Sequence, residues 1–422
     1  MKNYKILDQQ LSNLPEEIKY CKRCVVSNQR PRIVFSEDGI CSACHYSDLK
    51  KSSIDWSSRE KELRDLCDQY RRTDGRFDVL VPASGGKDSA RVAYELKYLY
   101  NMHPLTVTWA PFEYTPAGFI NFRDFIKVGG FNNIMAWPNG HLHRKLSRIA
   151  FEIVGDNFLP FIYGQVSYPF HIAKQFDIKL VFFGENGEAE YSGDPKVFNL
   201  RGMPFELWAE QYFKGATIDD LVQYGLNETN YLKSSDFDES DLQFYRPPPI
   251  ESMTEQGVEF HWFSYYKKWI PQENFYLASE HTGFHANPEG RSEGTYSKYA
   301  SLDDKLDGLH YYMAFIKFGI GRTTSDAAHE IRDGHITREE GMALVRQFDG
   351  EFPARWFEES LKYLDITELE FWEVVDRFRP SHLWEKRNNS WQLKQPVYED
   401  LPEFKDSGLP GYLSSLVALQ KL

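Results

Sequence analysis

The order of apolar and polar residues predicts a parallel sheet flanked by helices in the first half of the chain. Short runs rich in β-branched and aromatic residues alternate with segments whose apolar side chains recur every three or four positions. The runs expected as strands are 77–81, 105–109, 133–137 and 179–183. Such alternation is typical of α/β proteins, in which helices cover both faces of a parallel sheet.

Four regions follow from this pattern. Residues 1–50 hold a cysteine cluster and turn formers, and 51–74 are expected to form a charged linking helix. Residues 75–350 are expected to form the α/β domain, with an irregular excursion at about 190–262, where proline, tyrosine and acidic residues gather. Residues 351–422 are expected to be a helical C-terminal region.

Two helices of the last third carry a reciprocal capping pattern at their start. Thr337 is followed three residues later by Glu340, and Thr367 by Glu370. In this pattern each side chain accepts a hydrogen bond from the backbone N–H of the other residue. The pattern predicts that helices begin at these two threonines.

The chain is acidic, with a formal net charge of −13 over 422 residues. This charge argues against sequence-independent binding of nucleic acid, which needs a basic surface. No stretch approaches the roughly 20 apolar residues that span a bilayer, and nothing typical of a secretory signal follows Met1. We therefore expect a cytoplasmic protein with no membrane insertion and no nucleic-acid partner.

Four cysteines lie in two C-x-x-C pairs, Cys21 with Cys24 and Cys41 with Cys44. Four thiolates in two such pairs can complete a tetrahedron around zinc, and a site without an open position is structural. Four reduced packing thiols and a redox centre are the alternatives. The polar segment has little core of its own, and the spacing suits metal better, so the sequence predicts a zinc ribbon with Cys67 outside it.

The segment after the first strand has the composition of an anion-binding turn. The chain passes through Gly85 and Gly86 into a helix, so backbone N–H groups and the helix N-terminus can face phosphate oxygens. Ser84 and Ser89 add hydroxyl donors, and Lys87 adds positive charge. The spacing does not fit G-x-x-x-x-G-K-[ST], the loop that usually serves cleavage between β and γ phosphates.

Two other segments carry charges suited to phosphate chemistry. The fourth strand runs into Gly184, Glu185 and Glu188 at the carboxyl edge of the sheet, where open α/β folds bind ligands. Lys317 and Arg322 flank two glycines and offer cations for charge that develops on phosphate. A solvated acidic turn and a basic surface turn are the alternatives.

Residues Ser84 to Ser89 resemble the S-G-G-x-D-S signature of the N-type ATP pyrophosphatases, the PP-loop enzymes, which include asparagine, NAD and GMP synthetases and tRNA thiolases. The resemblance implies a Rossmann-like fold and release of pyrophosphate from ATP. The ATP-binding residues that it implies are Ser84, Gly85, Gly86, Lys87, Asp88, Ser89, Trp109 and Gly184.

The turn after the fourth strand resembles the G-E-G-S-D-E segment of asparagine synthetase. This resemblance implies that Glu185 assists proton removal from ammonia and that Glu188, with Asp88, holds Mg²⁺ on the pyrophosphate. The expected catalytic set is Lys87, Asp88, Glu185, Glu188, Lys317 and Arg322.

A longer resemblance narrows the family. Together with the cysteines and both turns, segments 266–273, 293–304 and 317–332 resemble the N-acetyl sugar amidotransferases of surface-glycan biosynthesis, of the WbpG and PseA type, over about residues 18–387. This implies conversion of the acetamido group of a sugar or nucleotide sugar into an acetamidino group. ATP would adenylate the amide oxygen, and ammonia would then displace AMP.

The ammonia is expected from a separate glutaminase subunit or from solution. A glutaminase needs a nucleophilic cysteine at the N-terminus or in a G-x-C-x-G turn. Met1 is followed by Lys2, and Cys67 lies between leucine and aspartate, so neither context fits.

Two other functions remain as alternatives. A tRNA-thiolating enzyme shares the nucleotide loop and often a zinc ribbon, but it typically needs further cysteines near the catalytic domain, where only Cys67 remains. A non-catalytic nucleotide-binding scaffold is the other alternative, which the undamaged loop disfavours.

Overall fold

The computed structural model describes residues 6–202, 204 and 212–399. Parts of three expected regions fall outside these ranges, namely 1–5 of the cysteine-rich region, 203 and 205–211 of the excursion, and 400–422 of the C-terminal region. Nowhere in the described ranges does a helix combine the length and the apolar composition that a bilayer crossing demands.

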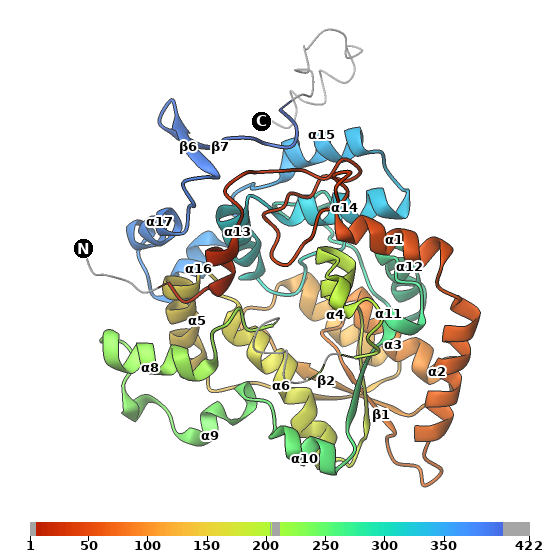
Figure 1. Cartoon of the computed structure of the whole chain (residues 1–422). Helices are drawn as coiled ribbons and strands as arrows, with labels where there is room; N and C mark the ends of the chain where they lie inside the picture. The colour runs from red at the N-terminus through yellow and green to blue at the C-terminus, as the bar shows by residue number, and fades with distance from the viewer. Residues whose placement is uncertain (1–5, 203, 205–211, 400–422) are drawn as a thin grey trace.

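Five parallel strands form the central sheet in the order β3-β2-β1-β4-β5 (Figure 1). The strands are β1 (Val79–Pro82), β2 (Pro104–Trp109), β3 (Asn132–Ala136), β4 (Leu180–Phe183) and β5 (Glu259–Trp262). The first four confirm the strands expected from the sequence. The order reverses between β1 and β4, and the crevice outside their carboxyl ends is where open α/β folds bind ligands.

The fifth strand corrects the expected course of the 190–262 excursion. This segment returns to the sheet, because β5 pairs in parallel with β4. Phe260, His261 and Trp262 are buried there, and the His261 imidazole forms a 2.7 Å hydrogen bond with the Tyr266 hydroxyl. A four-residue run with a histidine inside it is too short for periodicity to reveal, so the pairing with β4 decides its structure.

One face of the sheet is covered by a helix that precedes the glycine turn in the chain and by four helices that follow it. Val79, Val81 and Phe182 belong to the core on this face, and their neighbours Leu80 and Val181 belong to the core on the other. The helices of the first face are α2 (Trp56–Tyr70), α3 (Lys87–Tyr98), α4 (Pro116–Lys127), α11 (Phe263–Tyr266) and α12 (Pro271–His281).

The second face is covered by the long helices between β3 and β4 and by the helices of the excursion. They are α5 (Gly140–Val154), α6 (Leu159–Gln175), α8 (Ile218–Glu228), α9 (Glu239–Leu242) and α10 (Ile250–Glu255). The single-turn elements are η1 (Gln9–Asn13), η2 (Glu188–Ser192), η3 (Pro195–Val197), η5 (Ser234–Asp236) and η6 (Gln243–Tyr245).

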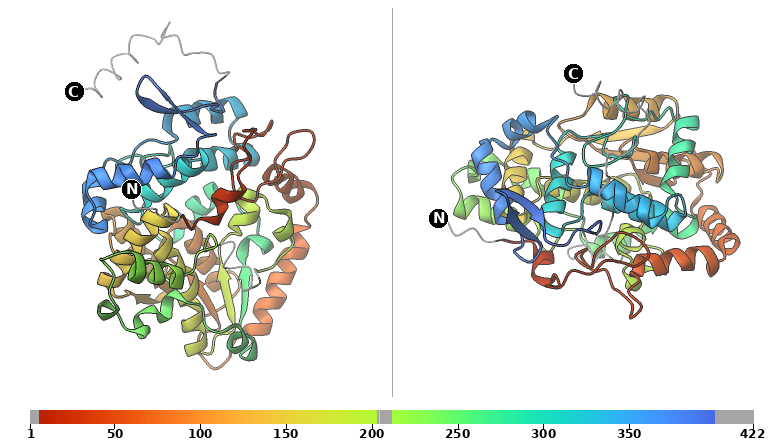
Figure 2. Two further views of the ribbon diagram at one scale, coloured as in Figure 1. Left: turned by 60° about the vertical axis from the view of Figure 1, so that its left-hand side comes forward. Right: turned by 90° about the horizontal axis from the view of Figure 1, so that it is seen from above.

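The helices of the last third lie above the sheet in Figure 1 and in the left view of Figure 2, on the side of its carboxyl edge. They are α13 (Asp307–Phe318), α14 (Arg322–Asp333), α15 (Arg338–Phe348), α16 (Phe357–Leu364) and α17 (Glu368–Arg377). The reciprocal caps at Thr337 and Thr367 are both present, which confirms the predicted starts of α15 and α17.

The expected helical character of the C-terminal region is wrong at residues 384–393. This stretch forms an antiparallel hairpin of β6 (Trp384–Arg387) and β7 (Ser390–Leu393). Asn388 and Asn389, the two residues between the strands, have φ values of 49° and 63°. Asparagine tolerates this left-handed conformation, and two such residues in succession are the signature of a tight hairpin turn.

The cysteine-rich segment packs against the C-terminal helices. The four paired cysteines share one buried cluster with Ala327 and Ala328 of α14 and with Met342 and Val345 of α15. The helix α1 (Ser42–Ser52) begins directly after Cys41. Figure 1 shows this red N-terminal segment beside α14 and α15.

Candidate active site

The glycine turn connects β1 to α3 and depends on Gly85. This residue has a φ of +86°, and a Cβ atom built on it would lie 2.5 Å from the Cα atom of Phe122. Any other residue would therefore meet both backbone strain and a collision with α4. Gly86 follows as the N-cap of α3, so the first N–H groups of that helix face the turn.

The side chains of the turn hold its backbone. The Ser84 hydroxyl accepts a 3.3 Å hydrogen bond from the Gly86 N–H, and the Ser89 hydroxyl donates a 3.2 Å bond to the Gly86 carbonyl. The Lys87 ammonium lies 2.5 Å from the Asp88 carboxylate. Serine hydroxyls, an ammonium group and helix N–H groups together form a site suited to an anion.

Asn274 of α12 fixes the orientation of Asp88. Its amide nitrogen donates a 2.8 Å hydrogen bond to Asp88 Oδ1, and its oxygen accepts a 2.6 Å bond from Arg91. Asn274 is fully buried, so the Asp88 carboxylate has a rigid support. No motif near position 274 links this residue to the turn, so the sequence alone does not reveal its role.

A cavity of about 540 Å³ opens beside this turn at the carboxyl edge of the sheet. Its polar wall residues include those of the turn, Glu185, Asp303 and Arg322, and its apolar wall residues include Trp109 and Phe161. The cavity brings together most of the predicted site residues, which are Ser84, Gly86, Lys87, Asp88, Ser89, Trp109, Gly184, Glu185 and Arg322. Gly85 instead supports the turn from behind, against α4.

Glu185 stands in an environment that disfavours its charged form. Burial, and then the nearby charge of Asp88, raise the pKa of the Glu185 carboxyl to about 7, while Lys87 acts in the opposite direction. A carboxyl group with this pKa is partly protonated at neutral pH and can exchange a proton with a reacting group. Perturbed carboxyls in a cavity are typical of catalytic sites.

Asp303 is a cavity residue that the sequence analysis missed. Burial raises the pKa of its carboxyl to about 6, against a lowering hydrogen bond from Ser84. Its neighbour Asp304 is buried, accepts a 2.8 Å hydrogen bond from the Leu306 N–H, and also has a raised pKa. The pair lies in the 293–304 segment that carries the resemblance, but no local motif distinguishes it from a surface acidic turn.

Arg322 begins α14 and reaches the cavity wall. Its guanidinium donates to the Tyr311 hydroxyl and lies 3.2 Å from the Asp326 carboxylate. These two partners fix the side chain, so the cation is held at the cavity before any ligand arrives.

The structure does not bring Glu188 and Lys317 to the cavity. Both carboxylate oxygens of Glu188 accept hydrogen bonds from Arg32, at 2.7 and 2.6 Å. Lys317 is buried and donates to Asp8, at 2.7 Å, and to the Val154 carbonyl, at 3.0 Å. The roles expected for these two residues in magnesium and phosphate binding therefore need correction, because each charge is already paired elsewhere.

The four paired cysteines form a compact group of sulfur atoms. All four are fully buried, and their sulfur atoms lie within 4.8 Å of one another. The separations are 3.9 Å between Cys21 and Cys44 and 3.7 Å between Cys24 and Cys41. Tetrahedral zinc with Zn–S bonds of about 2.3 Å needs sulfur atoms about 3.8 Å apart, so the group fits zinc.

The fold and the cavity together define an α/β protein of the doubly wound class, with a glycine turn at the strand reversal and a buried four-cysteine group. Residues 293–398 match the family model for the C-terminal domain of WbpG-like LPS biosynthesis proteins. This segment provides Asp303, Asp304 and Arg322 to the cavity wall. The match supports a role in glycan biosynthesis.

A short stretch of the chain is also similar to a protein of another description. Over 84 residues it is 30% identical to the enolase-phosphatase E1 of Aquifex aeolicus (strain VF5). The match covers 19% of this chain and 33% of that protein. Because it spans about a third of that relative, it carries no activity over to this chain.

Proposed function

We propose that the protein is an ATP-dependent amidotransferase that converts the acetamido group of a sugar or nucleotide sugar into an acetamidino group, with release of AMP and pyrophosphate. The observation that supports this most is the meeting of the glycine turn, Glu185 and Arg322 around one cavity at the strand reversal. The match of the C-terminal segment to LPS biosynthesis proteins supports the glycan substrate.

In this proposal the polar wall binds the phosphates of ATP. The N–H groups at Gly86 and the start of α3, with Ser84, Ser89 and Lys87, hold the β and γ phosphates. The apolar wall with Trp109 takes the remaining part of a substrate. A volume of about 540 Å³ falls within the usual range of a ligand site.

Of the carboxylates that line this cavity, Asp88 and Asp303 would hold Mg²⁺ in place of the predicted Glu188. Mg²⁺ is usually held by one or two carboxylates together with substrate phosphates, which two cavity carboxylates satisfy. When bound, the ion neutralises charge on the leaving pyrophosphate. Arg322 adds a fixed cation on the same wall.

The chemistry proceeds in two steps. The amide oxygen attacks the α phosphorus and pyrophosphate leaves, which makes the amide carbon a good electrophile. Ammonia then adds to that carbon, AMP leaves with the oxygen, and the surplus proton passes to the Glu185 carboxylate. The raised pKa of Glu185, about 7, suits a group that accepts a proton and releases it again at neutral pH.

We also propose that ammonia comes from a separate glutaminase subunit or from solution. Cys67 is buried in α2, and burial raises the pKa of its thiol to about 12. A thiol in this state is a poor nucleophile, since the thiolate is the reactive form. The chain should therefore use ammonium salts alone, and glutamine only when a glutaminase is added.

Mass spectrometry tests the proposal. The chain is incubated with ATP, Mg²⁺, an ammonium salt and UDP-linked acetamido sugars, one at a time. Replacement of oxygen by NH lowers the product mass by about one unit, as expected for an oxygen activated as a leaving group. The nucleotide products should be AMP and pyrophosphate, and ADP with orthophosphate would contradict the proposal.

The two alternative functions receive less support. A tRNA-thiolating enzyme needs reactive thiols, but no cysteine lines the cavity in the part of the chain that the structure describes. A scaffold without catalysis would not need a carboxyl of raised pKa beside an anion-binding turn. Copurified tRNA, seen as a high ratio of absorbance at 260 to 280 nm, would favour thiolation.

A further inference from the structure

A second, much smaller cavity borders on the main cavity. It has a volume of about 30 Å³ and shares Lys87, Tyr299 and Arg322 with the main cavity. Its other walls come from the start of α12, with Gln272, and from α14 and the residues that follow it, with His335. The two cavities are therefore neighbours with three side chains in common in their walls.

The size of the second cavity selects its occupant. A space of 30 Å³ exceeds the roughly 10–15 Å³ that one water molecule needs. It is far below the roughly 300 Å³ at which sites for larger organic ligands begin. Water and ammonia fit, whereas a nucleotide or a sugar does not.

The lining of this cavity carries charges of both signs. Its carboxylates are Asp326, Glu330 and Asp333, and its cations are Lys87 and Arg322. One pair is already formed, because Asp326 lies 3.2 Å from Arg322. The other two carboxylates attract ammonium to the cavity.

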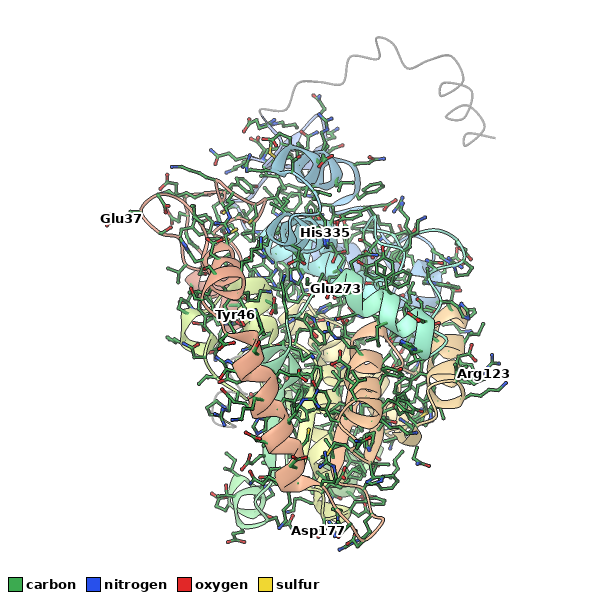
Figure 3. All side chains as sticks on the ribbon, turned by 90° about the vertical axis from the view of Figure 1, so that its right-hand side faces the viewer. Glu37, Tyr46, Arg123, Asp177, Glu273 and His335 are labelled. Carbon is green, nitrogen blue, oxygen red and sulfur yellow. The ribbon has the colours of Figure 1, made fainter. Side chains whose placement is uncertain are left out.

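The cavity reaches the surface where the start of α12 meets the residues after α14, because His335 lines it and is exposed. Figure 3 faces this side of the molecule and shows Glu273 of α12 close to His335, with both side chains at the surface. Gln272 and His335 both line the cavity, in agreement with this view. The carboxylate of Glu273 adds to the negative charge on this side.

One buried side chain in the cavity wall has a ring nitrogen without a hydrogen-bond partner among the described residues. His329 is 3% exposed, its Nδ1 atom makes no hydrogen bond there, and its Nε2 atom lies 3.4 Å from Glu190 Oε2. Burial lowers the pKa of this imidazole, so the ring is neutral at pH 7. A neutral ring nitrogen can exchange a hydrogen bond with ammonia as well as with water.

The small cavity is also lined by the turn that carries the proposed base. Tyr191 is among its lining residues and belongs to η2, which follows Glu185 in the turn after β4. Glu185 itself lines the main cavity, so this one turn contributes to both cavities.

We propose that the small cavity is the port through which ammonia reaches the adenylated substrate in the main cavity. The inference rests on the proposed function, because only a reaction that consumes ammonia requires such a port. Ammonia enters between α12 and α14, passes Lys87 and Arg322, and meets the activated carbon beside Glu185.

Filling the port tests the proposal. Ser297 lines the cavity and is 8% exposed, and its hydroxyl accepts a 3.3 Å hydrogen bond from the Tyr299 N–H. Ser297→Leu should raise the KM for ammonium at least tenfold, and the matched control Ser297→Ala should leave it unchanged. Substrate-dependent exchange of pyrophosphate into ATP should be the same in both variants, since that half-reaction uses no ammonia.

Widening the port gives a second, independent measurement in case Ser297→Leu does not fold. Gln272 accepts a 3.0 Å hydrogen bond from the Tyr299 hydroxyl beside the cavity. Gln272→Ala should reduce the preference for ammonium over methylammonium at least tenfold. Gln223→Ala, at an exposed position of α8, is the matched control and should leave that preference unchanged.

The outcomes separate the port from the function. Normal pyrophosphate exchange with an unchanged ammonium KM in Ser297→Leu, or an unchanged preference in Gln272→Ala, would contradict the port alone. Parallel loss of exchange and turnover in folded Ser297→Leu would assign the cavity to ATP binding instead. No exchange by the wild-type chain with any UDP-linked acetamido sugar would contradict the proposed function, and the port with it.

Discussion

The turns after β1 and β4 lie side by side at the strand reversal, yet they direct their charged side chains differently. Ser84, Lys87 and Asp88 of the first turn all line the cavity. The second turn is divided, because Glu185 lines the cavity while Glu188 and Glu190 pair with cations of the cysteine-rich segment. Position at the carboxyl edge of a sheet therefore does not by itself make a residue part of the site.

The difference arises from what packs beside each turn. A Cβ atom on Gly193 would lie 2.0 Å from the Ala43 nitrogen, so the end of the second turn touches the start of α1. From this contact Lys50 reaches Glu190 at 2.5 Å, and Arg32 reaches Glu188. Buried charge is stable only when paired, so these carboxylates turn away from the cavity towards the nearest cations.

Loss of metal from the cysteine group should have the largest effect on this comparison. The segment that supplies Arg32 and Lys50 is held by the four cysteines, which lie at the centre of its buried contact with α14 and α15. Structural zinc contributes on the order of 10 kcal/mol to folding in small zinc domains. Cys41→Ser should therefore lower the thermal midpoint more than any other variant named here and abolish zinc binding.

Elemental analysis checks the metal directly. The purified wild-type chain should contain about one zinc per molecule, as four thiolate ligands predict. Cys67→Ser, which removes a buried cysteine outside the group, should keep that zinc. A folded wild-type chain without zinc would contradict the assignment.

Asp88→Ala tests the first turn and should have the second-largest effect. The carboxylate is held by Asn274 and Lys87 and faces the cavity. If it binds Mg²⁺, its loss removes several kcal/mol of charge stabilisation, or about 10³-fold in the rate of pyrophosphate exchange. The thermal midpoint should change little, and a large fall of the midpoint with retained exchange would assign Asp88 a structural role.

Glu185→Gln tests the part of the second turn that faces the cavity. Loss of a general base typically costs about 10²-fold, and the loss should fall on amidine formation rather than on pyrophosphate exchange. In the wild-type chain, turnover at constant free ammonia should rise with pH around 7, the pKa of this carboxyl. The variant should lack that rise.

The same carboxyl also sets a trend in stability. Its pKa is about 7 in the folded chain, against 4.5 for an unperturbed glutamate. The folded chain therefore keeps a proton that the unfolded chain has already released, and the free energy of unfolding falls as pH rises between these values. The thermal midpoint of Glu185→Gln minus that of wild type should therefore be larger at pH 8 than at pH 5. An equal difference at the two pH values would contradict the raised pKa.

The fold was largely accessible from the sequence where patterns are long. Four strands, the helices between them and the capped starts at Thr337 and Thr367 follow from periodicity and local chemistry. β5 and the hairpin at 384–393 did not follow, for different reasons. β5 is determined by its pairing with β4, whereas the hairpin had a local signal in Asn388 and Asn389 that was overlooked.

The sequence predicted the site residues correctly only where they belong to one short motif. The glycine turn lies within six consecutive residues, and the structure brings its side chains to the cavity. Asn274 and Asp303 come from segments roughly two hundred residues further along, so only the folded chain joins them to the turn. Glu188 misled for the opposite reason, since its partner Arg32 lies far before it in the chain.

Of the proposed variants, Glu188→Gln should have the smallest effect. It tests most directly whether the turn after β4 is divided between the cavity and the cysteine-rich segment. The carboxylate is partly exposed and pairs with Arg32, and the loss of an ion pair at such a position costs about 1 kcal/mol. The thermal midpoint should fall by about one degree, while pyrophosphate exchange and its dependence on Mg²⁺ stay unchanged. Arg32→Gln should produce the same fall, and the double variant no more than either single change.

A loss of magnesium dependence in Glu188→Gln alone would instead show that Glu188 leaves Arg32 when ATP binds. The two turns would then act as one site in the loaded enzyme, and the division between them would hold only for the free chain.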